Sequence, residues 1–187
     1  ISQCKKISDV RKKNAEHLEK EIEKTLYELG MESARFKIDI SRLENFSSNG
    51  YDKVEFLISP NKGEPLKRLS KTASGGEMSR VMLALKSVLA EVDEIDTFIF
   101  DEIDTGVSGR TAQKVAEKLN MISKSHQILC ITHLPQIASM ADGHFLIEKK
   151  TIENRTFTNV FCLTKEESIK EIARLIGGAK ITEQTIN

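Results

Sequence analysis

Two short segments of the sequence carry residue types that could handle a phosphorylated ligand. The first is Ser74-Gly75-Gly76, which stands directly before a helix-forming stretch that begins with Glu77. A glycine turn that opens a helix presents unpaired backbone N–H groups at the positive end of the helix dipole, where an anionic phosphate can bind. Glycine also lets the backbone approach a ligand closely. Taken alone, such a tripeptide is more often a flexible turn with a serine cap.

The second segment is the apolar run Thr97 to Phe100, which ends in Asp101 and Glu102. The run predicts a strand, and its two acids would lie at the carboxyl edge of a sheet, where open α/β folds hold their ligands. Because Mg²⁺ keeps most of its water ligands, one aspartate is enough to orient it, and the second carboxylate is free to polarise an attacking water. The alternative is a helix N-cap or a surface turn.

The sequence holds no G-x-x-x-x-G-K-[ST] motif, the loop that cradles the phosphates in many nucleotide-binding folds. It begins with Ile rather than Met, and its polar first thirty residues do not resemble a signal peptide. We therefore expect a fragment that carries one part of a phosphate site and lacks the part that grips the nucleotide.

Composition limits the class of protein. With 39% apolar and 30% charged residues, the chain is typical of a soluble globular protein, and no apolar run approaches the roughly 20 residues that span a bilayer. We expect no membrane partner. Cys4, Cys130 and Cys162 form no C-x-x-C pair, which indicates buried thiols in a reducing cytosol. Since the net charge is zero, any contact with nucleic acid must be local.

The first thirty residues predict an amphipathic helix that stops at Gly30. Its stripe is about three heptads long, which is compatible with the end of a coiled coil. The basic start of this helix, residues 5–13, either touches DNA phosphates or forms a solvated face. The apolar positions of the stripe are Ile7, Val10, Leu18, Ile22, Leu26 and Leu29.

The remaining sequence predicts an α/β unit. Alternating patterns on both sides of Asn49-Gly50 predict two antiparallel strands, at 36–40 and 54–58. Farther along, helical and strand patterns alternate, which implies a parallel sheet with crossover connections. The expected helices are 76–89, 109–123, 135–141 and 165–176, and the expected strands are 97–101, 127–132, 144–149 and 156–163.

Four segments in this order and spacing resemble the C-terminal part of the RecN family, bacterial ATPases of DNA double-strand-break repair that are related to SMC proteins. The segments are 70–86, 98–110, 132–142 and 175–185. Ser-Gly-Gly-Glu alone would be a weak signal, and the combination carries the resemblance. It implies an α/β fold with the P-loop NTPase-like sheet and flanking helices of an ABC-type ATPase head. Residues 31–187 would form the C-terminal lobe of this head, and residues 1–30 the end of a coiled-coil arm.

The resemblance assigns roles to the residues that follow the strands. Asp101 matches the Walker B aspartate that orients Mg²⁺, and Glu102 matches the general base that aligns the attacking water. His133 matches the switch histidine at the γ-phosphate of ATP. Without the neighbouring motifs, a lone histidine after an apolar strand would be interpreted as a hydrogen-bonded turn residue. Asp104 matches the loop that crosses the dimer interface to the other nucleotide, and the alternative is an Asx-turn before Gly106.

The segment Ser74, Gly75, Gly76 and Glu77 matches the ABC signature, which binds the ATP held by an opposite subunit. Two heads would then sandwich two ATP molecules. An N-terminal half of the same protein would supply the Walker A lysine, so this fragment alone would be inactive. Family members are cytoplasmic and nucleoid-associated, bind DNA, and couple ATP hydrolysis to the tethering or processing of broken ends.

Three other classes stay open. The motor of a membrane transporter has no use for the N-terminal helical arm. A structural clamp that only uses ATP to gate DNA entrapment is disfavoured because Glu102 is present. A nuclease-associated SMC relative would differ by a partner that one sequence does not reveal.

Overall fold

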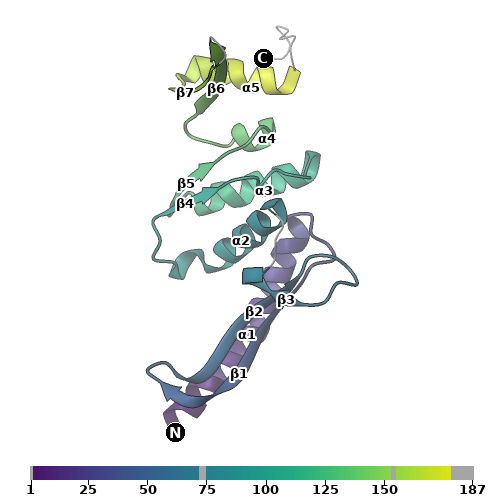
Figure 1. The fold of residues 1–187 in the computed structure, drawn as a ribbon, viewed down its shortest axis with the longest axis vertical. Coiled ribbons are helices and arrows are strands. Elements are labelled where there is room, and N and C mark those ends of the chain that lie inside the picture. Colours follow the sequence, from purple (N-terminus) through teal and green to yellow (C-terminus); the bar gives the residue numbers. More distant parts are fainter. Residues whose placement is uncertain (1, 72–74, 153–154, 178–187) are drawn as a thin grey trace.

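A computed structural model describes residues 2–71, 75–152 and 155–177 of the chain. The molecule is elongated, with an N-terminal helix and hairpin at one end, a central layer, and a C-terminal hairpin with its helix at the other end (Figure 1). Among the described residues, no helix combines the length and the apolar character that a bilayer crossing requires. The helices are α1 (Ser2–Glu28), α2 (Gly75–Leu89), α3 (Gly109–Ile122), α4 (Pro135–Ala138) and α5 (Lys165–Gly177), with short 3-10 turns at Leu69–Lys71 and Ala90–Val92. The strands are β1 (Arg35–Ser47), β2 (Gly50–Ser59), β3 (Lys67–Arg68), β4 (Thr97–Phe100), β5 (Gln127–Cys130), β6 (Phe145–Ile152) and β7 (Arg155–Cys162).

Strands β1 and β2 form the antiparallel hairpin expected from the Asn49-Gly50 turn, and helix α1 packs lengthwise on it. The buried residues of α1 form a seam along one side of the helix, at Ser8, Ala15, Ile22, Thr25 and Leu26. The sequence-based stripe is therefore wrong at its start, where Ile7 and Val10 are 42% and 58% exposed. The seam begins instead with polar contacts. Ser8 donates a hydrogen bond to Asp52 of β2 (2.8 Å), and the Arg11 guanidinium pairs with the same carboxylate (2.9 Å).

Two glutamates of α1 cover the free edge of β1. The Glu19 carboxylate accepts a hydrogen bond from the Ile38 amide, and the Glu23 carboxylate accepts one from the Phe36 amide, both at 2.8 Å. Strand β1 lies at the edge of the β1-β2-β3 sheet, so these amides have no strand partner on that side. An unpaired strand edge invites association with other chains, and the carboxylates satisfy its donors instead.

The central layer confirms the expected parallel pairing. Strands β4 and β5 run parallel in the register Thr97 with Gln127 through Phe100 with Cys130, and α3 is the crossover between them. Helix α3 buries Val115, Leu119 and neighbouring apolar residues in the same core as α2. Strands β6 and β7 pair antiparallel in a separate sheet within the described part of the chain.

The register of the seam on α1 can be tested with two isoleucines of the same helix. We expect Ile22→Ala to lower the free energy of unfolding by about 3 kcal/mol, because Ile22 is fully buried and its truncation leaves a cavity. The matched change Ile7→Ala removes the same atoms from a partly exposed position and should cost less than about 1 kcal/mol. Urea denaturation followed by circular dichroism measures both. Equal costs for the two variants would contradict the seam.

Candidate functional site

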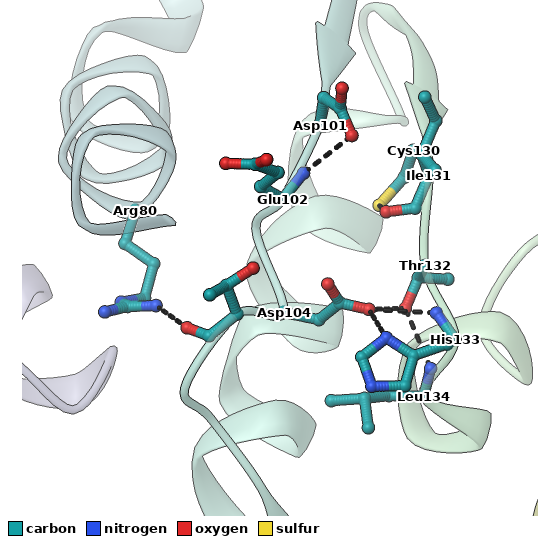
Figure 2. Close-up of polar contacts among 10 residues, drawn as sticks. Arg80, Asp101, Glu102, Asp104, Cys130, Ile131, Thr132, His133 and Leu134 are labelled. Atoms are coloured by element: carbon teal, nitrogen blue, oxygen red, sulfur yellow. Dashed lines mark hydrogen bonds and ion pairs between the residues drawn. The ribbon is translucent and has the colours of Figure 1, made fainter. Parts of the chain in front are cut away.

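The carboxyl end of β4 faces the beginning of α2. Asp101 and Glu102 follow β4 directly and are exposed, and the Glu102 side chain is directed toward α2 (Figure 2). A Cβ atom on Gly75 would collide with Glu102 Oε2, and one on Gly76 would fall 2.9 Å from the Glu102 carbonyl oxygen. Gly76 therefore requires glycine, because backbone atoms of the segment after β4 lie too close for a side chain, whereas a side chain at Gly75 would displace the Glu102 carboxylate.

The backbone at Glu102 has an uncommon conformation. Its φ is 56°, and among the described non-glycine residues it is the only one with a positive φ. Residues with side chains visit this left-handed region at a cost of roughly 1 to 3 kcal/mol, and such strain gathers at functional sites. Neighbouring bonds hold the turn. The Glu102 amide donates to Asp101 Oδ1 (2.9 Å), and the Ser79 hydroxyl donates to the Asp101 carbonyl oxygen (2.7 Å).

A buried aspartate joins the ends of β4 and β5. One carboxylate oxygen of Asp104 accepts hydrogen bonds from the Thr132 hydroxyl (2.7 Å) and from the His133 amide (2.9 Å), and it lies 2.9 Å from His133 Nδ1 (Figure 2). Asp104 is 6% exposed, whereas the His133 side chain is 74% exposed. When Nδ1 carries the proton that faces Asp104, Nε2 is left free toward solvent as an acceptor.

The pKa of Asp104 reflects two opposing influences. Burial raises the pKa of this carboxyl group, but the hydrogen bonds from Thr132 and His133, together with the electrostatic influence of the nearby His133 side chain, outweigh it and hold the pKa below its usual value. The carboxylate is thus kept ionised inside the fold. The hydrogen bonds to the Asp104 carboxylate come from Thr132 and His133, and the turn to Val107 is closed by the backbone carbonyl of Asp104 (3.3 Å) rather than by its side chain.

Arg80 is a site component that the sequence reasoning missed. Its guanidinium donates from Nη1 to the carbonyl oxygen of Thr105 (2.7 Å), and the residue is only 8% exposed. Desolvation by burial lowers the pKa of Arg80, and the nearby charge of Glu77 opposes this shift. Among the described side chains, Arg80 Nε is one of two buried polar atoms that have no partner. Helical periodicity could have found it, since Arg80 lies four residues after Gly76 on the buried face of α2.

The structure thus brings together six of the predicted site residues around the ends of β4 and β5 and the start of α2. These are Gly75, Gly76, Asp101, Glu102, Asp104 and His133. Glu77 lies in the first turn of α2. Ser74, the eighth predicted residue, lies outside the described residues, as does the predicted tail from residue 178 onward. The roles of all these residues stay predictions.

The chemistry of the donors suits a hard cation better than a soft one. Among residues 2–71, 75–152 and 155–177, no three His, Cys, Asp or Glu side chains come close enough to hold a metal ion by themselves. A Mg²⁺ at Asp101 would therefore take most of its ligands from water and from phosphate oxygens, as this ion usually does. Cys130 offers no thiolate, because burial, with smaller contributions from Asp104 and Asp101, raises its pKa to about 12. Cys162, expected to be buried, is exposed because both faces of the β6–β7 hairpin are largely open.

Nearly the whole length of the chain is similar in sequence to curated DNA repair proteins. The chain is 47% identical to the DNA repair protein RecN of Bacillus subtilis (strain 168) over 96% of its length. It is also 47% identical to the RecN of Halalkalibacterium halodurans over 96% of its length, and 41% identical to that of Vibrio cholerae over its whole length. The chain spans only 34%, 32% and 34% of these three relatives, respectively. No protein-family model matches it.

Solved SMC heads share the fold. The Smc head with a coiled coil and joint from Pyrococcus yayanosii has a TM-score of 0.56 at 22% identity, over 87% of this chain and 29% of that one. The Smc head of Pyrococcus furiosus bound to the C-terminal domain of ScpA has a TM-score of 0.55 at 21% identity, over 90% and 40% of the chains. A structure from work on ATP-driven dimerization and DNA-stimulated activation of SMC ATPases has a TM-score of 0.50 at 23% identity, over 92% and 99%. These matches confirm the expected α/β fold of an SMC/ABC-type head lobe.

The low pKa of Asp104 predicts a specific dependence of stability on pH. A carboxyl group whose pKa is lower in the folded state stabilises the fold above its unfolded-state pKa of about 4, and this contribution is lost as the pH falls through the folded-state pKa. Asp104→Asn cannot titrate. We therefore expect the difference in unfolding free energy between the original protein and this variant to shrink as the pH falls below about 4.

Urea denaturation at a series of pH values measures this difference. The control is Asp39→Asn, at an exposed aspartate of β1. A gap between the original protein and Asp104→Asn that stays constant across the acid range would show that the ionised carboxylate does not stabilise the strand ends.

Proposed function

The chain is RecN-like over nearly its whole length, and we propose that it forms the C-terminal lobe of an ATPase head that hydrolyses ATP in recombinational DNA repair. The observation that carries the proposal is the gathering of Asp101, Glu102 and His133 with the glycine start of α2 at one edge of the β4–β5 pair. The reaction is phosphoryl transfer from ATP to water, in which positioning and charge stabilisation supply most of the catalysis.

Each side chain has a separate task in this proposal. Asp101 holds Mg²⁺, which when bound neutralises charge on the phosphates. Glu102 accepts the proton of the attacking water, and its exposed carboxylate is available for this purpose. Asp104 holds the His133 imidazole by Nδ1, so Nε2 faces outward, where it can contact the γ-phosphate or the water. Asp104 is therefore a positioning residue in its own head, in addition to any contact that its loop makes with a second head.

A second head completes the site. Ser74, Gly75 and Gly76, together with the first-turn residue Glu77, present the N-terminal end of α2 to the ATP held by another copy of the protein. The work on ATP-driven dimerization of SMC ATPases supports such a homodimer. Within one head, α2 also contacts the segment after β4 through Ser79 and Arg80. The signature segment that serves the ATP of the second head is therefore connected to the catalytic residues that serve the ATP of its own head.

The N-terminal half of the same protein is the remaining partner. A hollow of about 820 Å³ lies between β5 and β6, and its lining is mostly apolar. Within the described residues, β5 pairs only with β4, and β6 pairs only with β7. Ile131 after β5 and Phe145 of β6 are exposed beside this hollow. A strand from the N-terminal half that entered it would join the two sheets and would bring the Walker A loop to the carboxyl end of β4.

The N-terminal arm favours this family over a transporter motor. Residues 1–30 would be the end of a coiled-coil arm, and the 27-residue length of α1 fits that assignment. The relatives act in DNA repair by name, which supports DNA as a partner and a cytoplasmic location at the nucleoid. A clamp that uses ATP only for gating is the second candidate, and Glu102 is the residue that separates it from a hydrolase.

Nucleotide affinity is the first test. The lysine and backbone amides of a phosphate loop supply most of the grip on the β- and γ-phosphates, and this sequence holds no such loop. We expect the 187-residue chain to bind MgATP with a Kd on the order of millimolar or weaker. Isothermal titration calorimetry measures it. Micromolar binding by the chain alone would mean that the nucleotide site lies elsewhere in this lobe.

The general base is tested in the protein with the N-terminal half restored. Glu102→Gln keeps the shape of the side chain but cannot accept the proton, so turnover should fall by roughly a hundredfold or more while ATP binding is retained. Dimers should then accumulate in ATP, as seen by light scattering. The matched control Glu94→Gln alters an exposed glutamate outside the site and should leave turnover unchanged. Unaltered turnover in Glu102→Gln would favour the gating clamp.

A further inference from the structure

Four lysines form a straight row on α1. Lys6, Lys13, Lys20 and Lys24 are separated by seven, seven and four residues, and all four are exposed. At 3.6 residues per turn these separations return to nearly the same side of a helix, so the four ammonium groups share one face. His17 lies four residues after Lys13 and three before Lys20, on the same side of the helix, and is also exposed. We call these five residues the lysine row.

The row lies on the side of α1 that faces away from the hairpin. The buried seam, which includes Ser8, Ala15 and Ile22, lies about half a turn around the helix from the row. The hairpin covers the seam, and Figure 1 shows it running along α1. The fold therefore fixes the orientation of the row and leaves its side open.

The lysines of the row have no acidic partners. Arg11 pairs with Asp52 and Lys37 pairs with Glu19, but none of the ion pairs among the described residues includes a lysine of the row. The acidic residues of α1 lie on the two flanks of this face. They are Asp9, Glu16, Glu19 and Glu23 on one flank and Glu21 and Glu28 on the other. The row is thus a narrow line of positive charge on a protein whose net charge is zero.

The dimensions of the row suit a long anion. Eighteen residues separate Lys6 from Lys24, which corresponds to about 27 Å along the helix. Since phosphates of one DNA strand follow each other every 3.4 Å along the duplex axis, this length corresponds to roughly eight base-pair steps, and the row meets those phosphates of the winding strands that face it. Lysine contacts phosphates as a point charge and carries no information about base sequence. A helical protein partner would need an apolar seam, and the five positions of the row include no apolar residue.

We propose that the lysine row is a DNA-binding surface that holds the phosphate backbone without reading its sequence. The inference deepens the proposed function, because it rests on DNA being the partner and states where on this lobe the contact lies. It requires neither ATP nor a second head. DNA binding can therefore be measured without nucleotide, and a failure here would leave the ATPase assignment to its own tests.

The test replaces all four lysines by glutamine, which retains helix propensity and removes the charge. A labelled duplex and a labelled single strand are titrated with the 187-residue chain, and anisotropy is recorded at several salt concentrations without nucleotide. Each phosphate contact contributes about 0.9 to the slope of log K against log salt on a duplex. The fourfold variant should therefore lower the slope by about three to four and weaken binding at least about tenfold at low salt.

The matched control replaces four other exposed lysines, Lys62, Lys124, Lys149 and Lys165, so that the change in net charge is identical. We expect this control variant to keep most of the affinity for DNA. A second variant, in which the four lysines of the row are replaced by arginine, should keep all of it. Circular dichroism checks that α1 remains helical in each variant. Equal losses in row and control variants, or an unchanged salt slope in the row variant, would overturn the proposal. Loss of binding to polyglutamate with unchanged binding to DNA would also overturn it and would assign the row to an acidic protein.

Discussion

The buried carboxylate of Asp104 is the interaction on which the geometry of the site depends. Strands β4 and β5 are only four residues long, and their backbone ladder ends before the residues that could do chemistry. Asp104 continues the connection beyond the ladder, because a single oxygen binds both the hydroxyl of Thr132 and the amide of His133. Removing a carboxylate that satisfies two donors would leave polar groups in a confined space, which costs more than the bonds contribute on average. Asp104 is therefore buried, ionised and responsible for the position of His133.

Helix α2 imposes the second constraint. Gly75 and Gly76 allow its first turn to approach Glu102, and Ser79 and Arg80 bind the carbonyl oxygens of Asp101 and Thr105. The backbone between β4 and α3 is thus held from two sides, by Asp104 toward β5 and by α2 on its other side (Figure 2). The left-handed conformation of Glu102 persists between these two attachments, since a strained residue needs neighbours that determine its conformation.

Local patterns were sufficient to predict much of this arrangement. The sequence predicted β4, β5 and their parallel pairing, because short apolar runs separated by an amphipathic helix leave few alternatives. It also predicted which residues follow the strands, since these positions are adjacent in the chain. Contacts between distant segments were not predictable in the same way. Periodicity places Arg80 and Ser8 on the buried faces of their helices, but their partners Thr105 and Asp52 depend on how α2 and the hairpin pack. For the same reason, the stripe on α1 was placed wrongly at Ile7 and Val10.

Several apolar residues of β4, β5 and β6 are exposed to solvent. Ile99, Leu129 and Ile131 along β4 and β5, and Phe145 and Ile147 on β6, are at least 45% exposed. Exposed apolar residues gathered on neighbouring elements often mark a surface that another protein segment covers. In the N-terminal arm, by contrast, charged residues cover the exposed surfaces: glutamates cover the edge of β1, and lysines occupy the outer side of α1. Exposed apolar residues thus lie along β4, β5 and β6 beside the proposed nucleotide site, and exposed lysines lie along the outer side of α1. This division fits a lobe whose centre is completed by another part of its own protein, while the outer side of its arm remains available to a polyanion.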